Sequence, residues 1–150
     1  MLEIGGTTLV LTHDAIVEGV HYRPDDAPED VAWKLVAVNL SDLAAKGARP
    51  RGALVGYALR DAAWDAAFAD GLGKALAAFG MPLLGGDTVS GSAGRTLSLT
   101  AIGEATGPVP SRIGAAAGDD LWVTGSIGDA GLGLLILQGQ IDGDDALTRR

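Results

Sequence analysis

The chain has 150 residues, of which 47% are hydrophobic and 20% charged, a composition that excludes a disordered protein and predicts one domain or slightly more. Its net charge of -8 argues against nucleic acid as a partner, and no apolar run approaches the roughly 20 residues needed to cross a membrane. The chain has no cysteine and shows no signal peptide, so disulfides and thiolate metal sites are excluded and we expect a cytoplasmic protein.

Strands and helices alternate in the predicted element order. The predicted strands are residues 7–13, 53–59, 81–85, 97–103 and 121–124. The predicted helices are residues 29–46, 62–79 and 131–138. The segment 14–27 is predicted as a loop. Pro28 suits the first turn of the first helix, and Gly47 ends it. Asp61 is the expected N-cap of the second helix, and Gly80 follows its last turn.

These elements predict an α+β fold. We expect a mixed or antiparallel sheet, with helices 29–46 and 62–79 on one face. The other face should be apolar, because the strands at 8–12 and 97–101 both supply alternate aliphatic residues. A composition shift at residues 107–110, with the sequence Gly-Pro-Val-Pro, predicts a boundary between residues 1–109 and residues 110–150.

Aspartates stand beside apolar segments at Asp14, Asp42 and Asp87. A carboxylate is costly to bury without a counter-charge, and no matching set of basic residues lies nearby in the sequence. Hard cations can supply the counter-charge, and several aspartates commonly occur together where a protein binds Mg²⁺ with a phosphate ligand. We therefore predict that the three carboxylates converge around one cleft, with Asp87 at the tip of a turn after Gly85 and Gly86.

The first helix carries a polar stripe. Asn39, Asp42 and Lys46 follow one another at three- and four-residue spacing, which places them on one side of the helix. One interpretation is a surface ion pair between Asp42 and Lys46. The other is that Asp42 faces a metal ion while Asn39 supports the site.

His13 and His21 are the only histidines of the chain. A zinc site that includes them with Asp14 and Glu18 is one alternative, although their spacing matches no helical zinc signature. A solvated loop residue is another interpretation of His21. A substrate hydrogen bond is the functional interpretation that we prefer, because the loop joins two elements that carry aspartates.

The order of these motifs resembles the thiamine-monophosphate kinases of the aminoimidazole-ribonucleotide-synthetase superfamily. The matching stretches lie at residues 12–22 (THDAIVEGVHY), 33–34 (WK), 38–48 (VNLSDLAAKGA), 84–88 (LGGDT) and 111–115 (SRIGA). The resemblance implies transfer of the ATP γ-phosphoryl group to thiamine monophosphate, with several Mg²⁺ ions and a homodimer whose open sheet faces meet. It implies an N-terminal domain over residues 1–109 that binds ATP and Mg²⁺, and the start of a C-terminal domain from residue 110.

The resemblance also implies roles for individual residues. By position in the motifs, Thr12, Asp14, Asp42 and Asp87 match metal ligands. His21 matches a residue near the thiamine phosphate. The residues that match nucleotide contacts are Gly86, Asp87 and Arg112.

The sequence departs from the family pattern at two positions. His13 stands where a hydroxyl residue is usual, and Lys46 stands where methionine is usual. The family's initial Gly-Asp-Asp-Ala segment and its later segments do not occur, so we expect the chain to be a fragment of a longer enzyme. The remaining alternatives are another ATP-dependent enzyme of the superfamily, a non-catalytic module that binds Mg²⁺ and nucleotide, and a structural dimerisation domain.

Overall fold

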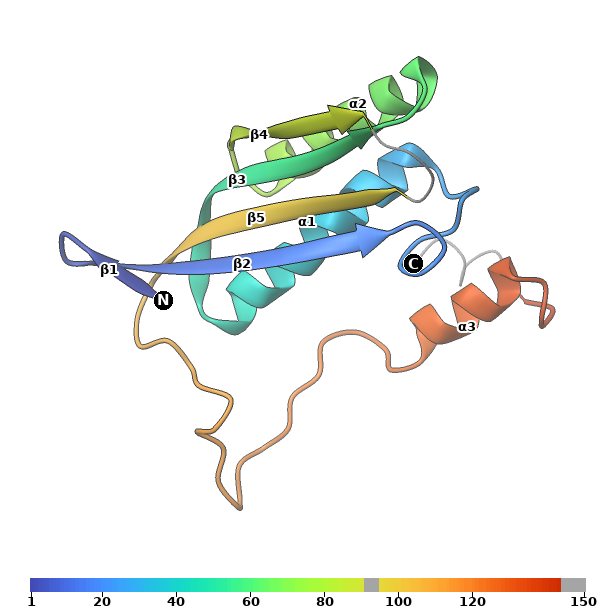
Figure 1. The fold of residues 1–150 in the computed structure, drawn as a ribbon. Helices are drawn as coiled ribbons and strands as arrows, with labels where there is room; N and C mark the ends of the chain where they lie inside the picture. The colour runs from blue at the N-terminus through green and yellow to red at the C-terminus, as the bar shows by residue number, and fades with distance from the viewer. Residues whose placement is uncertain (91–94, 144–150) are drawn as a thin grey trace. The chain divides into compact units, whose positions relative to one another are not determined.

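The computed structural model describes residues 1–90 and 95–143. The chain divides into two compact units, Met1–Ser111 and Arg112–Arg150. The first unit carries the sheet and two long helices (Figure 1).

The sheet of the first unit has five strands in the order β1-β2-β5-β3-β4 (Figure 1). The strands are β1 (Leu2–Ile4), β2 (Thr7–Val17), β3 (Ala48–Leu59), β4 (Leu83–Ser90) and β5 (Thr96–Ala105). The pair β3 and β4 is parallel, and the other three neighbouring pairs are antiparallel. The predicted α+β fold with a mixed sheet is therefore confirmed.

Both long helices lie on the same side of this sheet (Figure 1). Helix α1 spans Pro28–Ala45 and helix α2 spans Ala62–Ala78. The predicted boundary residues act as expected: the Asp61 carboxylate accepts a hydrogen bond from the backbone N–H of Trp64 at 3.0 Å. Gly47 and Gly80 follow the helices with φ of +61° and +60°, a conformation that ends a helix at little cost for glycine.

The helix-covered face of the sheet holds the core. The fully buried side chains of the strands on this face include Ala53, Leu97, Leu99 and Ala101. These side chains pack against the buried residues of the two helices, which are Val31, Leu35, Val36, Leu43, Phe68, Leu72, Ala75 and Leu76. Neither α1 nor α2 covers the opposite face, which we call the open face (Figure 1).

The prediction about the open face needs a correction. Leu97, Leu99 and Ala101 were expected to make it apolar, but they are the buried residues of the covered face. Side chains alternate along a strand, so the open face of β5 instead carries Ser98, Thr100 and Ile102. The open face is therefore mixed, with exposed leucines from other strands beside these hydroxyl groups.

Several predicted element boundaries were wrong. Strand β2 continues through Asp14 to Val17, so Asp14 lies inside a strand and not at its end. Asp87 lies inside β4 and not at the tip of a turn. The segment 121–124, predicted as a strand, has no regular secondary structure. Its apolar residues are exposed, from Val123 at 60% to Leu121 at 97%, so no described residue of the second unit covers them as a strand face.

The second unit contains helix α3 (Asp129–Leu137), close to the predicted helix at 131–138. Among the described residues, no helix is both long enough and apolar enough to cross a membrane.

Candidate functional site

The edge of the covered face between β2 and α1 brings two predicted site residues together. The Thr12 hydroxyl, on β2, donates a hydrogen bond to the Asp42 carboxylate, on α1, at 3.0 Å. Asp42 is exposed, so solvent or a ligand can reach the carboxylate. The strand and helix thus place a hydroxyl and a carboxylate side by side although they are 30 residues apart in sequence.

Asp14 lies on the same side of β2 as Thr12, because residues two apart in a strand share a face. Its side chain is half-buried. Within the described residues, the Asp14 carboxylate has no hydrogen-bond donor and no basic partner within 4.0 Å. A half-buried carboxylate without a counter-charge is a ready ligand for a cation.

The polar stripe of α1 is divided between different partners. Lys46 donates from Nζ to the carbonyl oxygen of Pro110 at 2.8 Å. The alternative interpretation, a surface pair between Asp42 and Lys46, is not supported, because this pair is not among the ion pairs of the described residues. Asn39 is fully buried, and its amide donates to the carbonyl oxygen of Leu35 at 3.0 Å. The Asn39 side chain therefore stabilises helix α1, whereas the Asp42 carboxylate is available to bind a ligand.

Asp87 lies on the other face of the sheet. It pairs with Gly56 in the parallel register of β3 and β4, and Gly56 packs toward Ser98 of the open face. Among the described residues, no group of three His, Cys, Asp or Glu side chains is arranged to hold a metal ion. The prediction that Asp14, Asp42 and Asp87 converge around one cleft was therefore wrong, because a strand sends alternate side chains to opposite faces.

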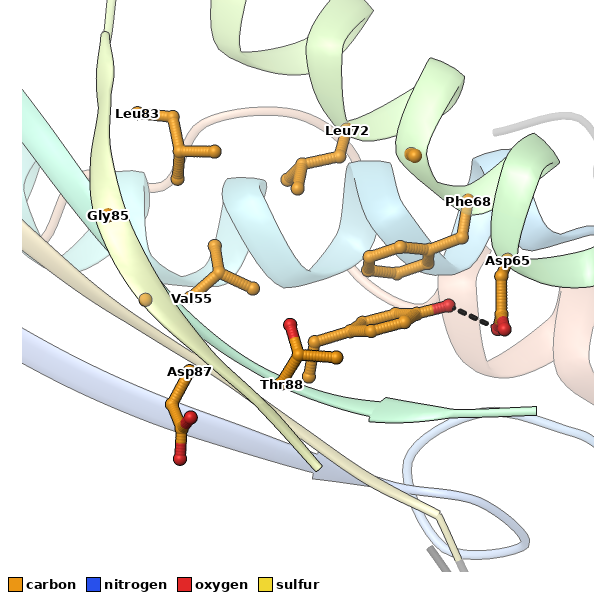
Figure 2. A pocket seen from close by; sticks show the side chains of 11 residues that line it. Val55, Asp65, Phe68, Leu72, Leu83, Gly85, Asp87 and Thr88 are labelled. Carbon is orange, nitrogen blue, oxygen red and sulfur yellow. Dashed lines mark hydrogen bonds between the residues drawn. The ribbon is translucent and has the colours of Figure 1, made fainter. Parts of the chain in front are cut away.

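A pocket of about 270 Å³ lies between β4 and α2, beside Gly86 (Figure 2). Its walls are mostly apolar and include Phe68, Leu72 and Leu83, while the Asp87 carboxylate points away to the other side of β4 (Figure 2). A Cβ atom at Gly86 would lie 2.0 Å from the carbonyl oxygen of Val55, so glycine is required for β4 to pair here.

One end of this pocket is polar. The Tyr57 hydroxyl donates to the Asp65 carboxylate at 2.6 Å, the bond drawn dashed in Figure 2. Burial and this hydrogen bond raise the pKa of Tyr57 above its usual value of 10.0. The same carboxylate also accepts the backbone N–H of Arg60, at 3.0 Å to Oδ1. Tyr57 therefore stays neutral at physiological pH and serves as a hydrogen-bond donor.

His21 stands in a tight loop directly after β2. Its ring nitrogen Nδ1 accepts a hydrogen bond from the backbone N–H of Val17 at 3.0 Å. Its own backbone N–H donates to the carbonyl oxygen of Val17 at 2.8 Å. Lys34, on α1, donates from Nζ to the His21 carbonyl oxygen. The loop is thus held to the strand and to the helix, and the ring is oriented by its backbone neighbour.

A cluster that the sequence did not predict fixes the start of this loop. Arg95 is 7% exposed, and its guanidinium lies 3.9 Å from the centre of the Trp64 ring and 3.9 Å from the Glu18 carboxylate. Glu18 also donates its backbone N–H to the Arg95 carbonyl oxygen at 2.9 Å and pairs with Arg60 at 3.6 Å. The sequence signal that could have indicated this cluster is the presence of Glu18 in the motif at residues 12–22 together with Arg60 and Arg95, which could pair with it.

The remaining predicted residues lie elsewhere. His13 is on the open face, where its Nδ1 lies 2.8 Å from the Thr100 hydroxyl. The zinc alternative is not supported among the described residues, since His13 belongs to the face opposite Asp14 and no metal-binding group is found there. Arg112 is the first residue of the second unit, and its side chain is exposed.

Comparison with known proteins supports the resemblance read from the motifs. A thiamine-monophosphate kinase of Caulobacter vibrioides is 47% identical over 150 residues, covering 97% of this chain and 43% of that protein. The crystal structure of the enzyme of that name from Stenotrophomonas maltophilia K279a is 40% identical, with a TM-score of 0.82, covering 92% of this chain and 44% of the other. The structure described as AaThiL complexed with AMPPCP and TMP is 32% identical, with a TM-score of 0.90, covering 99% of this chain and 50% of the other.

The chain thus spans half or less of the length of these relatives. The family described as AIR synthase related protein, N-terminal domain, matches residues 1–105, which is most of the first unit. The protein belongs to this family and contains its N-terminal domain.

Proposed function

We propose that the full-length protein transfers the γ-phosphoryl group of ATP to thiamine monophosphate and so makes thiamine diphosphate. The single observation that carries this proposal is the half-buried Asp14 carboxylate, without a basic partner among the described residues, beside the Thr12–Asp42 pair. The relatives at 32–47% identity support it, because they are named thiamine-monophosphate kinases or are bound to AMPPCP and TMP. A cytoplasmic location would supply the required ATP.

The residues at the covered-face edge fit Mg²⁺. This ion prefers oxygen ligands and is usually held by one or two carboxylates together with substrate phosphates. Asp14 and Asp42 would supply the two carboxylates, and the Thr12 hydroxyl keeps Asp42 oriented. When bound, Mg²⁺ neutralises charge on phosphate oxygens and aligns them for transfer.

The chemistry requires positioning more than a strong base. A phosphate oxygen of thiamine monophosphate forms a new bond to the γ-phosphorus of ATP, while the bond from that phosphorus to the β–γ bridging oxygen breaks and ADP leaves. The acceptor phosphate is already an anionic nucleophile, so no proton needs to be removed. His21 is proposed to hold this phosphate, and its ring is already oriented by Val17.

The nucleotide would lie beside Gly86 and Asp87. Arg112 is proposed to contact the ATP phosphates from the start of a second domain, which we propose begins at residue 110 after an N-terminal domain over residues 1–109.

A homodimer that forms through the open face would allow Asp87 to bind a metal ion. Within one chain, Asp87 lies on the face opposite Asp14 and Asp42. We propose that the open faces of two copies pack together, and that the Asp87 carboxylate then binds metal in a site completed by the second copy. The exposed leucines of this face, Leu11 at 49% and Leu54 at 42%, would be covered in such a dimer.

The test is ADP release by the purified full-length protein with Mg²⁺-ATP, in the presence of thiamine monophosphate or of unphosphorylated thiamine. Release that depends on thiamine monophosphate, with formation of thiamine diphosphate, is the expected result. Mg²⁺-ATP binding without turnover would instead indicate a non-catalytic module. Absence of any nucleotide binding would leave a structural dimerisation domain.

A further inference from the structure

Lys34 belongs, with Lys46 and Arg49, to the cations of the first unit that have no ion pair among the described residues. The arginines Arg51, Arg60 and Arg95, and Lys74, all have a carboxylate within 4.0 Å. Lys34 has none among the described residues, although the chain carries a net charge of -8. Its ammonium is nevertheless held in place, because it donates to the carbonyl oxygen of His21. A fixed cation without an anionic partner is prepared for an anionic ligand.

His21 supplies a second donor at the same place. The backbone N–H of Val17 donates to Nδ1 of the ring, so Nδ1 carries no proton and the neutral ring has its proton on Nε2. The His21 side chain is exposed, so this Nε2–H can reach a ligand. An ammonium has three N–H groups, and the His21 carbonyl uses one of those of Lys34.

The position of Lys34 on α1 relates it to the proposed metal ligands. Lys34 and Asp42 are eight residues apart, which places them on one side of the helix, about 12 Å apart along its axis. Strand β2 follows that side, since Thr12 contacts Asp42 while His21, just after the strand, contacts Lys34. One edge of the unit therefore has a carboxylate end and a cationic end.

We propose that Lys34 and His21 together form an oxyanion subsite that binds the phosphate of the acceptor substrate. The Lys34 ammonium provides the charge, and the His21 Nε2–H provides the direction of the hydrogen bond. This inference rests on the proposed function for the identity of the acceptor, thiamine monophosphate. The two carboxylates attract phosphate only through Mg²⁺, whereas the Lys34–His21 subsite binds it without a metal ion.

The experiment compares Lys34→Gln, Lys34→Arg and the control Lys74→Gln in the full-length protein. Lys74 is an exposed residue on α2 that pairs with Asp70 at 2.5 Å, outside the proposed site. Isothermal titration measures the affinity for thiamine monophosphate and for thiamine, each without Mg²⁺. We expect Lys34→Gln to weaken thiamine monophosphate binding about tenfold, because a charge-assisted hydrogen bond is lost, and to leave thiamine binding within about twofold. Lys34→Arg should retain most of the affinity, and Lys74→Gln all of it.

A purely structural role of Lys34 gives a different result. If Lys34 only tied the His21 loop to α1, its loss would weaken thiamine and thiamine monophosphate binding equally, and this outcome would overturn the proposal. Unchanged binding of both ligands in Lys34→Gln would overturn it as well. In turnover, the KM for thiamine monophosphate should rise while the KM for ATP stays within about twofold, and the reverse pattern would assign Lys34 to the nucleotide.

A titration with inorganic phosphate separates this inference from the proposed function. Phosphate should shift the ring NMR resonances of His21 in the wild type but not in Lys34→Gln, with His13 on the open face as the internal control. If the wild type shows this Lys34-dependent shift but does not phosphorylate thiamine monophosphate, the subsite stands and the proposed function fails. Turnover of thiamine monophosphate without any such shift would be evidence against the subsite alone.

Discussion

The two faces of the sheet are made by the same strands but differ in burial and in chemistry. On the covered face, Leu97 and Leu99 are fully buried against α1 and α2. On the open face, Leu54 is 42% exposed and Leu11 is 49% exposed. Strand β2 contributes to both faces, and a shift of its register by one residue would exchange its two sets of side chains.

The polar residues are divided by the same alternation. Thr12 and Asp14 lie at the edge of the covered face, near Asp42, whereas His13 between them contacts Thr100 on the open face. Asp87 also lies on the open face. The covered face thus carries a site edge that one chain can form, and the open face carries polar groups that a second copy could use.

The largest expected effect tests the difference in burial. Leu99→Ala should destabilise the protein by about 3 kcal/mol, because it leaves a cavity in the core of the covered face. The matched change Leu54→Ala, one strand away on the open face, should cost less than about 1 kcal/mol in dilute protein. Urea unfolding at low protein concentration measures both. Equal costs at every dilution would mean that the two faces are buried alike within one chain.

The second prediction tests the chemistry of the covered-face edge. Asp42→Asn keeps the shape of the side chain but removes the charge proposed to bind Mg²⁺, so turnover in the full-length protein should fall at least about a hundredfold. Asp87→Asn should give a loss of similar size if the open face completes the site in a dimer. The measurement is steady-state phosphorylation of thiamine monophosphate at varied Mg²⁺.

The control for both changes is Asp70→Asn, which removes an exposed carboxylate of α2 that pairs with Lys74. It should leave turnover unchanged, since neither partner lies at the proposed site. Normal activity of Asp42→Asn at limiting Mg²⁺ would remove Asp42 from the metal site. If Asp42→Asn reduced turnover and Asp87→Asn did not, the metal ligands would be confined to the covered face.

Much of the fold followed from local sequence signals. Asp61, Gly47 and Gly80 marked the helix ends correctly because capping depends on a few neighbouring residues. The extension of β2 through Asp14 to Val17 was missed, since an isolated carboxylate in a short segment suggests a loop. Pairing with β5 over this whole length stabilises the strand, and that pairing is a long-range property.

The site was predicted less completely than the fold. Of the predicted metal ligands, Thr12 and Asp42 are in contact, and their role in metal binding stays a prediction. The face of Asp87 could not be derived from its neighbours, because it depends on the register of β4 against β3. Gly86 matches a nucleotide contact by its position in the motif, but the close Val55 carbonyl shows that strand pairing alone requires glycine there.

The third prediction tests the proposed use of the open face. Leu54→Lys places a charge in the middle of the surface proposed to be buried between two copies, and it should weaken the homodimer at least about tenfold. Ala66→Lys adds the same charge on the exposed side of α2 and should leave the dimer intact. Sedimentation velocity over a range of protein concentrations reports the association. A wild-type protein that is monomeric throughout would overturn the dimer proposal.

The smallest expected effect concerns a polar contact on the covered face. The Tyr57 hydroxyl donates to Asp65 at 2.6 Å at the rim of the pocket. Tyr57→Phe should cost about 1 kcal/mol of unfolding free energy at neutral pH, the usual net value of one hydrogen bond. The cost stays modest because the Asp65 carboxylate still accepts the backbone N–H of Arg60.

This cost should depend on pH in one direction. Burial and the bond to Asp65 raise the pKa of Tyr57 in the folded protein above its usual value of 10.0. The contribution of the tyrosine is therefore fully present below about pH 10 and is lost as the pH rises toward the higher pKa of the folded state. Urea unfolding of wild type and Tyr57→Phe between pH 7 and about pH 11 should show the gap narrowing only above about pH 10. A gap that widened with pH would mean that the folded protein favours the ionised phenolate, and the covered face would then hold a charge there.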